Sequence, residues 1–383
     1  MTQILYITSA GSHWGSEESL FSLIRNIPQC RYEPFVLTVQ GPFQQKLKQF
    51  GIHHAVFQSY TLSKKECLPF ILLIWRISKF ILRNKFSLIH SNDIHSAQYS
   101  ILAARLSKIP AVIHVRSPGL PSWLLCKNRI IIQLAEKIIA ISENVKKELI
   151  EIGIPEKNIT VISNAVDTSV FNKQMSGMMF REEMGISDDT PLIGIVGRII
   201  PIKGQEVFIR AAAIISRIFP NALFVIVGEE PEADGTYVRQ LKDLAKKLDI
   251  RHQIRFSGFR ADIPFIMDAL DILVTPSEKE AFGRVIIEAM AMNTAVVAAN
   301  IGGIPEIIRH GINGFLAAPK NAEEIAAKVI RLLSDRHLYE SFCEQGRKTV
   351  QERYTISVQV EKISCLYDSL LNKDNCRNLK RMN

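Results

Sequence analysis

The sequence predicts an α/β protein built from two doubly wound domains. Short, continuously apolar runs alternate with helical stretches, and this alternation occurs twice along the 383 residues. Strands that are apolar on both faces are typical of a parallel sheet covered by helices on each side. A chain of this length also exceeds what one ordinary hydrophobic core accommodates, which favours two domains.

The predicted strands form two sets. The first set is QILYIT, EPFVLTV, HHAVF, LIHSN, AVIHVR and KIIAIS. The second set is LIGIVG, LFVIVG, IRFSG, ILVTPS, AVVAAN and GFLAAP. The stretch 161–171 lies between them without a helical period, so we expect it to connect the domains. This predicts Rossmann-like domains over residues 1–165 and 166–354, which face a cleft where a ligand would bind.

The charge of the chain is unevenly distributed. Of the net charge of +9, residues 1–165 hold 19 Lys and Arg against 10 Asp and Glu, and the remaining 28 and 28 cancel. The first domain is therefore expected to meet an anionic membrane surface or a phosphorylated substrate. Nucleic acid is a weaker candidate, because the sequence shows no stripe of Arg and aromatic residues and no known nucleic-acid module.

The compartment follows from the cysteines and the first residues. The six cysteines form no C-x-x-C pair, and the chain opens on a strand pattern rather than on a secretory signal. We therefore expect a reducing, cytoplasmic environment.

The stretch 68–86, LPFILLIWRISKFILRNKF, has the pattern of an interfacial helix. It is too short and too charged to span a bilayer. Arg76, Lys79 and Arg83 recur at helical spacing among aliphatic and aromatic residues. An ordinary helix that covers the sheet would show the same pattern, so both interpretations stay open.

The loops at the carboxyl ends of the strands hold the candidate site residues. Gly11 and Gly15 follow the first strand and permit a tight loop near a ligand, although a plain strand-to-helix turn would also explain them. Their G-x-x-x-G spacing is not the dinucleotide fingerprint, which argues against an NAD-dependent dehydrogenase. Arg198 and Lys203 flank a later loop and could bind a diphosphate, although solvated surface cations would show the same spacing.

The stretch EKEAFGRVIIEAM places a carboxylate within an aliphatic run. A helix that begins near Gly283 would put Glu280 in the preceding loop and Glu288 about a turn and a half inside the helix. The free N–H groups at the helix start favour an anion. A buried carboxylate without a partner is costly, so Glu288 meets either a protein donor such as a neighbouring Arg or the hydroxyls of a ligand.

Several motifs together resemble the retaining glycosyltransferases of the GT-B architecture, of the family 4 or group 1 type. They are VTPSEKEAFGRVIIEAMAMNTAVVAANIGGIPEIIRHGINGFL, GRIIPIKG, FSGFRADIPFIMDALDILVTPS, AISENVKKELIEIGIP and VISNAVDTSVF. The resemblance covers most of the chain and is strongest over residues 192–318. Ala165 and Asn293 stand where the family tends to have Gly, and Ala295 where it tends to have Pro. These departures remove no functional group.

The resemblance implies a nucleoside-diphosphate sugar as donor and assigns roles to the residues. Glu288 would bind the ribose diol, and Glu280 would lie near the transferred sugar. Backbone groups of Phe282 and Gly283 would approach the phosphates or the sugar, and Gly15 would belong to the same donor site.

The resemblance also implies how the leaving group is neutralised. Arg198 and Lys203 would balance the charge of the diphosphate, which would otherwise need a divalent metal. The sequence shows no D-x-D-type site in a matching loop, so we expect no required metal and no other cofactor. The base would lie beside Phe259 and Arg260.

One departure concerns the acceptor side. Many relatives have His where this chain has Arg116, which could stabilise the leaving phosphate or bind an acidic acceptor but cannot act as a base. His114 would share a strand face with Arg116, either as a core histidine or as a ligand contact. No general base is therefore assigned. The resemblance further implies that a C-terminal helix, about 355–383, packs back on the first domain.

The expected activity is the transfer of a hexose-type sugar to a glycan or lipid-linked acceptor, with retention at the anomeric carbon, in the synthesis of a cell-surface polysaccharide or glycolipid. The alternatives are a nucleotide-sugar epimerase on the same architecture and a non-catalytic protein that binds sugar nucleotides. Transfer of label to an acceptor distinguishes the first alternative, and release of nucleotide distinguishes the second.

Overall fold

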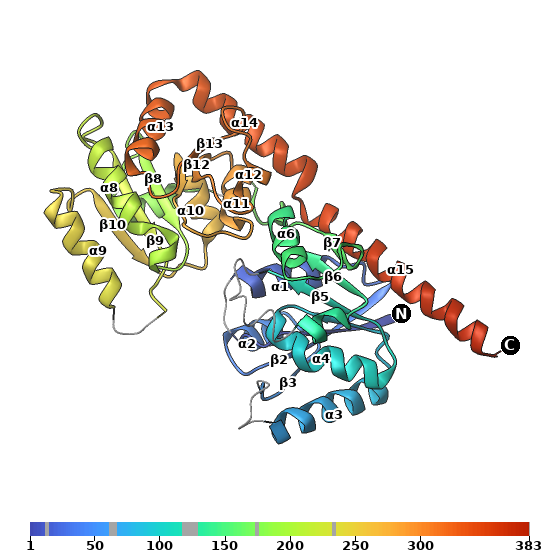
Figure 1. Cartoon of the computed structure of the whole chain (residues 1–383). Helices are drawn as coiled ribbons and strands as arrows, with labels where there is room; N and C mark the ends of the chain where they lie inside the picture. The colour runs from blue at the N-terminus through green and yellow to red at the C-terminus, as the bar shows by residue number, and fades with distance from the viewer. Residues whose placement is uncertain (12–14, 61–66, 117–128, 173–175, 232–234, 383) are drawn as a thin grey trace. The chain divides into compact units, whose positions relative to one another are not determined.

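The computed structural model describes residues 1–11, 15–60, 67–116, 129–172, 176–231 and 235–382. The chain divides into two compact units, of which unit 1 is Met1–Asn164 with Ile356–Asn383 and unit 2 is Ala165–Thr355. Each unit contains one parallel sheet with helices around it (Figure 1). The predicted fold class, two Rossmann-like α/β domains, is thereby confirmed.

Unit 1 has a seven-stranded parallel sheet in the order β3-β2-β1-β4-β5-β6-β7. Its strands are β1 (Thr2–Ile7), β2 (Tyr32–Thr38), β3 (His54–Val56), β4 (Leu88–Ser91), β5 (Ala111–Val115), β6 (Lys137–Ala140) and β7 (Ile159–Val161). Its helices are α1 (Gly15–Asn26), α2 (Pro42–Gln49), α3 (Cys67–Asn84), α4 (Ile94–Ser107), α6 (Glu143–Glu151) and α15 (Ile356–Met382), with a 3-10 turn at Glu156–Asn158.

Strands β4 and β5, in the middle of the unit 1 sheet, are buried along their whole length, although His90, Ser91 and His114 interrupt their apolar runs. Strand β7 was absent from the predicted sets, because it has only three residues and lies at the edge of the sheet, where two of the three are half-buried. Its short run therefore lacks the apolar signal of the inner strands.

The C-terminal helix α15 belongs to unit 1 and packs against α1. Its residues Ile363 and Tyr367 are fully buried. The Tyr32 hydroxyl on β2 donates to Asp368 Oδ1 on α15 at 2.6 Å, and Arg31 forms an ion pair with the same carboxylate. The buried side chains of α15, up to Leu370, are therefore part of the core of unit 1.

Unit 2 has a six-stranded parallel sheet in the order β10-β9-β8-β11-β12-β13. Its strands are β8 (Leu192–Val196), β9 (Leu223–Val227), β10 (Ile254–Gly258), β11 (Ile272–Thr275), β12 (Ala295–Ala299) and β13 (Phe315–Ala317). Its helices are α7 (Met178–Met184), α8 (Gln205–Ile215), α9 (Thr236–Lys247), α10 (Ile263–Ala269), α11 (Arg284–Ala291), α12 (Ile304–Ile307), α13 (Ala322–Ser334) and α14 (Arg336–Arg353), with a 3-10 turn at Pro201–Lys203.

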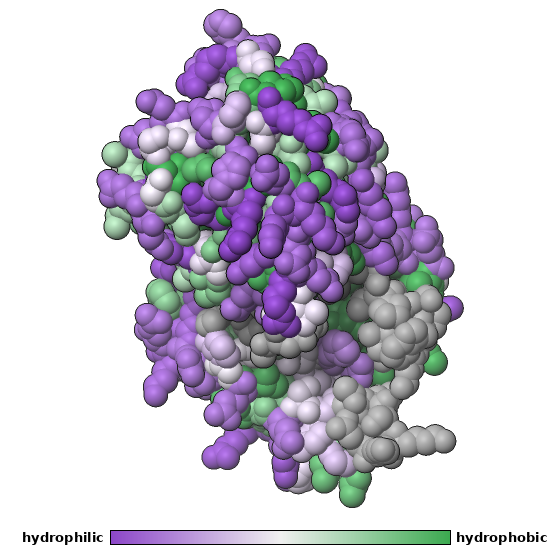
Figure 2. All heavy atoms as spheres, turned by 90° about the vertical axis from the view of Figure 1, so that its left-hand side faces the viewer, coloured by the Kyte–Doolittle hydropathy of each residue, from purple (hydrophilic) through white to green (hydrophobic). Residues whose placement is uncertain are grey.

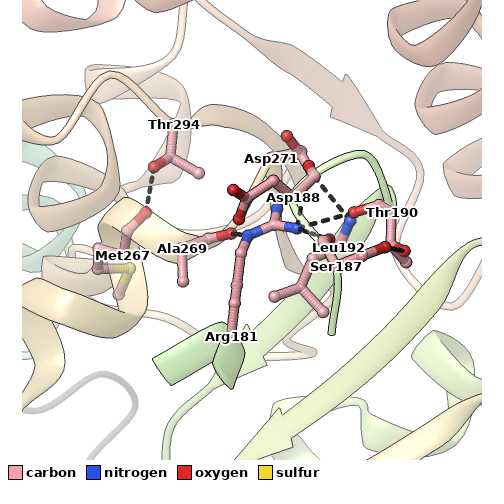
Figure 3. Close-up of polar contacts among 9 residues, drawn as sticks. All are labelled: Arg181, Ser187, Asp188, Thr190, Leu192, Met267, Ala269, Asp271 and Thr294. Atoms are coloured by element: carbon pink, nitrogen blue, oxygen red, sulfur yellow. Dashed lines mark hydrogen bonds and ion pairs between the residues drawn. The ribbon is translucent and has the colours of Figure 1, made fainter. Parts of the chain in front are cut away.

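A buried arginine connects the segments that precede strands β8 and β11 of this sheet (Figure 3). Arg181 on α7 donates to the carbonyl oxygens of Ala269 and Thr190, both at 2.9 Å, and to Asp271 Oδ2 at 2.9 Å. The same carboxylate oxygen accepts the backbone N–H of Leu192 at 2.7 Å. One guanidinium therefore joins α7, the end of α10 and the segments that lead into β8 and β11.

The surface in Figure 2 is mainly hydrophilic, and its hydrophobic residues form small separate patches. Among the helices of the described ranges, none is both long enough and apolar enough to cross a bilayer.

Candidate functional site

Three loops at the carboxyl ends of the unit 2 strands lie against one another. The Glu278 N–H donates to Ile202 O at 2.8 Å, and the Gly303 N–H donates to Glu280 O at 3.1 Å. A Cβ on Gly204 would lie 2.3 Å from Pro276 O, and one on Gly302 would lie 1.9 Å from Glu280 O. Both glycines also have positive φ angles, so a side chain is excluded twice. The backbone thus fixes the loops after β8, β11 and β12 as one assembly.

Lys203 and Glu280, predicted from separate motifs, meet in this assembly. Lys203 Nζ lies 2.6 Å from Glu280 Oε2, and both side chains are largely covered. Arg198 lies on the same loop as Lys203 and is exposed. Its carbonyl oxygen accepts a 2.8 Å hydrogen bond from Gln205 Nε2, a fully buried side chain at the start of α8. The loop between the two cations is therefore anchored at its base.

Glu288 is buried, with 7% of its surface exposed. Its Oε1 accepts a 2.8 Å hydrogen bond from Arg284 Nη2, one helical turn earlier. No residue in the described part of the chain donates to Oε2. The structure thus shows the protein partner of one carboxylate oxygen, while the ligand role of Glu288 stays a prediction.

At the start of α11, the backbone of Gly283 shapes the helix end and the side chain of Phe282 packs into the core. Gly283 caps the helix with a φ of 101°, which a residue with a Cβ rarely adopts. The Phe282 ring is buried and packs edge-on against Tyr354, with 5.6 Å between the ring centroids. The ring of Phe282 is therefore part of the core, and the predicted approach of its backbone to a ligand stays a prediction.

Phe259 and Arg260, expected beside the base, follow β10. The Phe259 ring is exposed. The Arg260 guanidinium is held by two carboxylates, those of Glu183 at 2.5 Å and Asp262 at 2.6 Å. Its charge is thus balanced within the protein, and the flat Phe259 ring is the group of the two that is open to a ligand.

Arg116 follows β5 in unit 1, and several of its partners in the described part of the chain are neutral side chains. Its Nε donates to Asn92 Oδ1 at 2.8 Å, and its Nη1 donates to Ser19 Oγ at 2.7 Å and to Asn164 Oδ1 at 2.6 Å. Its Nη2 lies 3.0 Å from His114 Nδ1. The sequence singled out Arg116 but did not predict the amide and hydroxyl partners, which come from segments far apart in the chain.

His114 is a core histidine. It is fully buried and shares the buried interior of unit 1 with His90. Burial, with the neighbouring Arg116 charge, lowers the pKa of His114 well below its usual value, so the ring is neutral. Its Nε2 has no hydrogen-bond partner among the residues that the structure describes.

Glu17, on the first turn of α1, is a buried carboxylate near Arg116 that the sequence prediction did not single out. Its carboxylate is buried and accepts from Ser16 Oγ at 2.8 Å. Burial raises the pKa of Glu17 to about 7, although the Ser16 hydroxyl and the Arg116 charge act to lower it. The signal in the sequence was a carboxylate two residues after Gly15, which lies exposed at the start of the same helix. Residues 12–14 of that predicted loop lie outside the described residues.

The described ranges contain no group of three or more His, Cys, Asp and Glu side chains that could hold a metal ion.

Two family descriptions match the chain, one on each side of the connection. Residues 15–170 match glycosyltransferase family 4, and residues 179–349 match glycosyl transferases group 1. The chain therefore belongs to the group 1 glycosyltransferases of the GT-B architecture.

Individual relatives are more distant. An uncharacterized glycosyltransferase, MJ1607, of Methanocaldococcus jannaschii is 37% identical over 57% of this chain and 56% of its own length. The UDP-Gal:alpha-D-GlcNAc-diphosphoundecaprenol alpha-1,3-galactosyltransferase of Escherichia coli is 26% identical over 77% of this chain and 79% of its own. For MJ1607, the N-acetyl-alpha-D-glucosaminyl L-malate synthase of Bacillus anthracis and the D-inositol 3-phosphate glycosyltransferase of Thermobispora bispora, the match spans only 49 to 62% of the relative's length.

Solved structures agree over the whole chain. Anabaena Alr3699/HepE, solved in complex with UDP and glucose and with UDP-glucose, is 26% identical and covers 97% of this chain and 100% of its own, with a TM-score of 0.85.

Proposed function

We propose that the protein transfers a sugar from a nucleoside-diphosphate sugar to an acceptor, with retention at the anomeric carbon. The observation that carries this proposal is Glu288, a buried carboxylate with one oxygen tied to Arg284 and the other without a protein partner. Two vicinal hydroxyls of a ribose are suitable donors to such a group, because hydrogen bonds to a carboxylate offset its desolvation. The UDP and UDP-glucose complexes of HepE support a donor of this class.

Unit 2 is proposed to be the donor-binding domain. Breaking the bond between the anomeric carbon and the phosphate oxygen leaves negative charge on the diphosphate. Arg198 and Lys203 would stabilise that charge, and backbone groups at Gly283 would approach the phosphates at the start of α11. Lys203 is already paired with Glu280, so the pair would divide between leaving group and sugar as the donor binds. On this account no metal ion is required.

Unit 1 is proposed to be the acceptor-side domain. The side chains of Asn92, Ser19, Asn164 and His114 orient the Arg116 guanidinium, which supports a role for its charge in binding a phosphate of the leaving group or an acidic acceptor. The acceptor in the name of the Escherichia coli galactosyltransferase is a GlcNAc-diphosphoundecaprenol, a lipid diphosphate. A glycan or lipid-linked acceptor in cell-surface polysaccharide or glycolipid synthesis is the corresponding proposal here.

Helix α3 is proposed to hold unit 1 on an anionic membrane surface. One face of α3 is buried and packs beside α4 (Figure 1). The opposite face exposes aliphatic residues and Trp75, which is 52% exposed and lies under Lys79 Nζ at 3.7 Å from the ring centroid. Arg76 and Arg83 are exposed on the same helix. An apolar surface with interleaved cations suits the headgroup region of a bilayer.

The membrane proposal has a direct test. Wild-type protein should sediment with anionic vesicles at low salt and not with neutral ones, and replacing Arg76, Lys79 and Arg83 with Glu should abolish sedimentation. Wild-type protein that stays in the supernatant at low salt would remove the membrane from the proposal and favour a soluble acceptor.

The activity has its own test. The protein is incubated with a panel of UDP-, GDP-, ADP- and dTDP-sugars, and release of nucleoside diphosphate is measured with and without a diphosphoundecaprenol-linked acceptor. We expect one nucleotide to be preferred, with release that depends on acceptor. An epimerase would change the sugar while it stays attached to the nucleotide, and a sensor would bind the donor and release nothing.

A further inference from the structure

A chain of buried polar side chains in unit 1 connects the C-terminal helix to Arg116. The Tyr367 hydroxyl on α15 lies 2.5 Å from His90 Nδ1, and His90 Nε2 lies 3.3 Å from His114 Nδ1. His114 Nδ1 in turn lies 3.0 Å from Arg116 Nη2. The Tyr6 hydroxyl lies 3.2 Å behind that of Tyr367. The two tyrosines and both histidines are fully buried, so the relay is isolated from bulk water.

The protons of this relay can be placed from one end to the other. Arg116 is always protonated and can only donate, so His114 Nδ1 must be an acceptor and its proton must be on Nε2. His90 Nε2 faces the same acceptor nitrogen, and two acceptors at that distance would repel, so His90 must carry its proton on Nε2 as well. Its Nδ1 is then an acceptor, and the single hydroxyl proton of Tyr367 must go to this nitrogen at 2.5 Å rather than to the Tyr6 oxygen at 3.2 Å, so that the Tyr6 hydroxyl donates to Tyr367.

Both rings stay in these neutral forms over the working range of pH. Burial, with the charge of Arg116, lowers the pKa of His90 to about 3. The same causes lower the pKa of His114, and the nearby His90 adds to them. Each neutral ring can still carry its proton on either nitrogen. The hydrogen bond made by one ring nitrogen decides whether the other nitrogen is protonated.

We propose that Tyr367 is a positioning residue for Arg116: its hydroxyl donates to His90 Nδ1 and so stabilises, from the far end of the chain, the tautomer in which His90 donates to His114 and His114 keeps an acceptor towards the guanidinium. Without that hydroxyl His90 Nδ1 would be a buried acceptor with no donor, which costs free energy. Part of the protein would then adopt the other His90 tautomer and lose the hydrogen bond to His114. Arg116 would then lose the fixed hydrogen-bond acceptor that His114 provides, while its contacts with Asn92, Ser19 and Asn164 would remain. Insofar as the effect on activity needs Arg116 to contact substrate, this inference rests on the proposed function.

The activity arm of the test compares two phenylalanine variants. Tyr367→Phe should lower kcat/KM for the acceptor about tenfold, the size of one positioning hydrogen bond, and leave the donor KM within twofold. Tyr32→Phe is the matched control, because it keeps the ring that packs edge-on against Tyr367, with 5.6 Å between the centroids, and removes a hydroxyl whose described partners on α15 are Asp368 and Ser364. In an Arg116→Lys background, Tyr367→Phe should add little further loss. Equal losses in Tyr367→Phe and Tyr32→Phe would overturn the proposal.

The spectroscopic arm does not depend on activity. In ¹⁵N-histidine-labelled protein, long-range nitrogen–proton spectra report which ring nitrogen carries the proton, and loss of signals in His90→Asn and His114→Asn assigns the two rings. Wild type and Tyr32→Phe should show both rings protonated on Nε2, and Tyr367→Phe should show a mixture at His90. A wild-type His114 protonated on Nδ1, or a His90 that Tyr367→Phe leaves unchanged, would refute the relay even if the protein proves to be a transferase. Normal tautomers in a protein without transfer activity would instead refute only the proposed function.

Discussion

Glu288 gives the sharpest test of the donor site, because one of its oxygens is tied to the protein and the other is not. The change Glu288→Gln keeps the shape of the side chain and a carbonyl that can accept from Arg284, but removes the charge. A hydrogen bond to a charged group contributes about 1.5–3 kcal/mol net and a neutral one about 0.5–1.5. The substitution should therefore cost about 1–2 kcal/mol of donor binding, which raises the Kd of the nucleoside diphosphate about 5- to 30-fold.

The assay is isothermal titration calorimetry with the nucleoside diphosphate that the donor panel selects. The chain offers a matched control in Glu340, which pairs with Arg336 at the same i, i+4 spacing and in the same order, but on the exposed surface of α14. Glu340→Gln should leave the Kd unchanged. If Glu288→Gln binds as well as this control does, with an unchanged melting temperature, Glu288 is only the helical partner of Arg284 and the donor-site argument fails.

Three further predictions follow from the contacts. Arg181→Met should lower the free energy of unfolding by about 3–5 kcal/mol in denaturant titrations, because it leaves buried carbonyl groups and a carboxylate without their donor; a loss no larger than that of Arg210→Met, an exposed helical arginine, would argue against this clamp. Lys203→Met should lower kcat at least tenfold and weaken donor binding less, with wild-type activity retained in EDTA, because the charge it meets grows in the transition state; a strict requirement for Mg²⁺ or Mn²⁺ with a nearly normal variant would contradict the metal-free scheme. Glu17 binds its proton more tightly in the folded state, because burial raises its pKa from 4.5 to about 7, so the free energy of unfolding should fall by up to about 3 kcal/mol as pH rises through that window. Glu17→Gln should flatten the dependence of melting temperature on pH between 5 and 8, and an unaltered profile would show that Glu17 titrates normally.

The fold could be predicted from the sequence where burial is continuous. Strands such as β12, in which every residue is buried, are recognisable in the sequence as unbroken aliphatic runs. Strand β7 did not, because half-buried residues at a sheet edge give a short and mixed pattern. The spacing of Glu288 within its helix followed from periodicity alone.

The contacts of the candidate site were less predictable, because they join segments far apart in the chain. Lys203 and Glu280 were both expected, but their 2.6 Å pairing depends on how the loops after β8 and β11 pack through Gly204 and Pro276. Arg116 donates hydrogen bonds to Ser19 on α1 and to Asn164, which follows β7. A local pattern carries no information about such pairs. Likewise, nothing beside Tyr367 in the sequence indicates a link to a residue on β4.

The central claim is that a sugar leaves its nucleoside diphosphate and becomes attached to an acceptor. The measurement that tests it most directly follows a sugar labelled with ¹³C at the anomeric carbon, supplied on the preferred nucleotide together with the acceptor, by NMR. The account predicts that the label appears in a new glycosidic bond with the anomeric configuration of the donor, in amounts equal to the nucleoside diphosphate released, and that Glu288→Ala slows both together. Inverted configuration would contradict retention. A label that stays on the nucleotide, whether unchanged or as another sugar, would contradict the transferase itself.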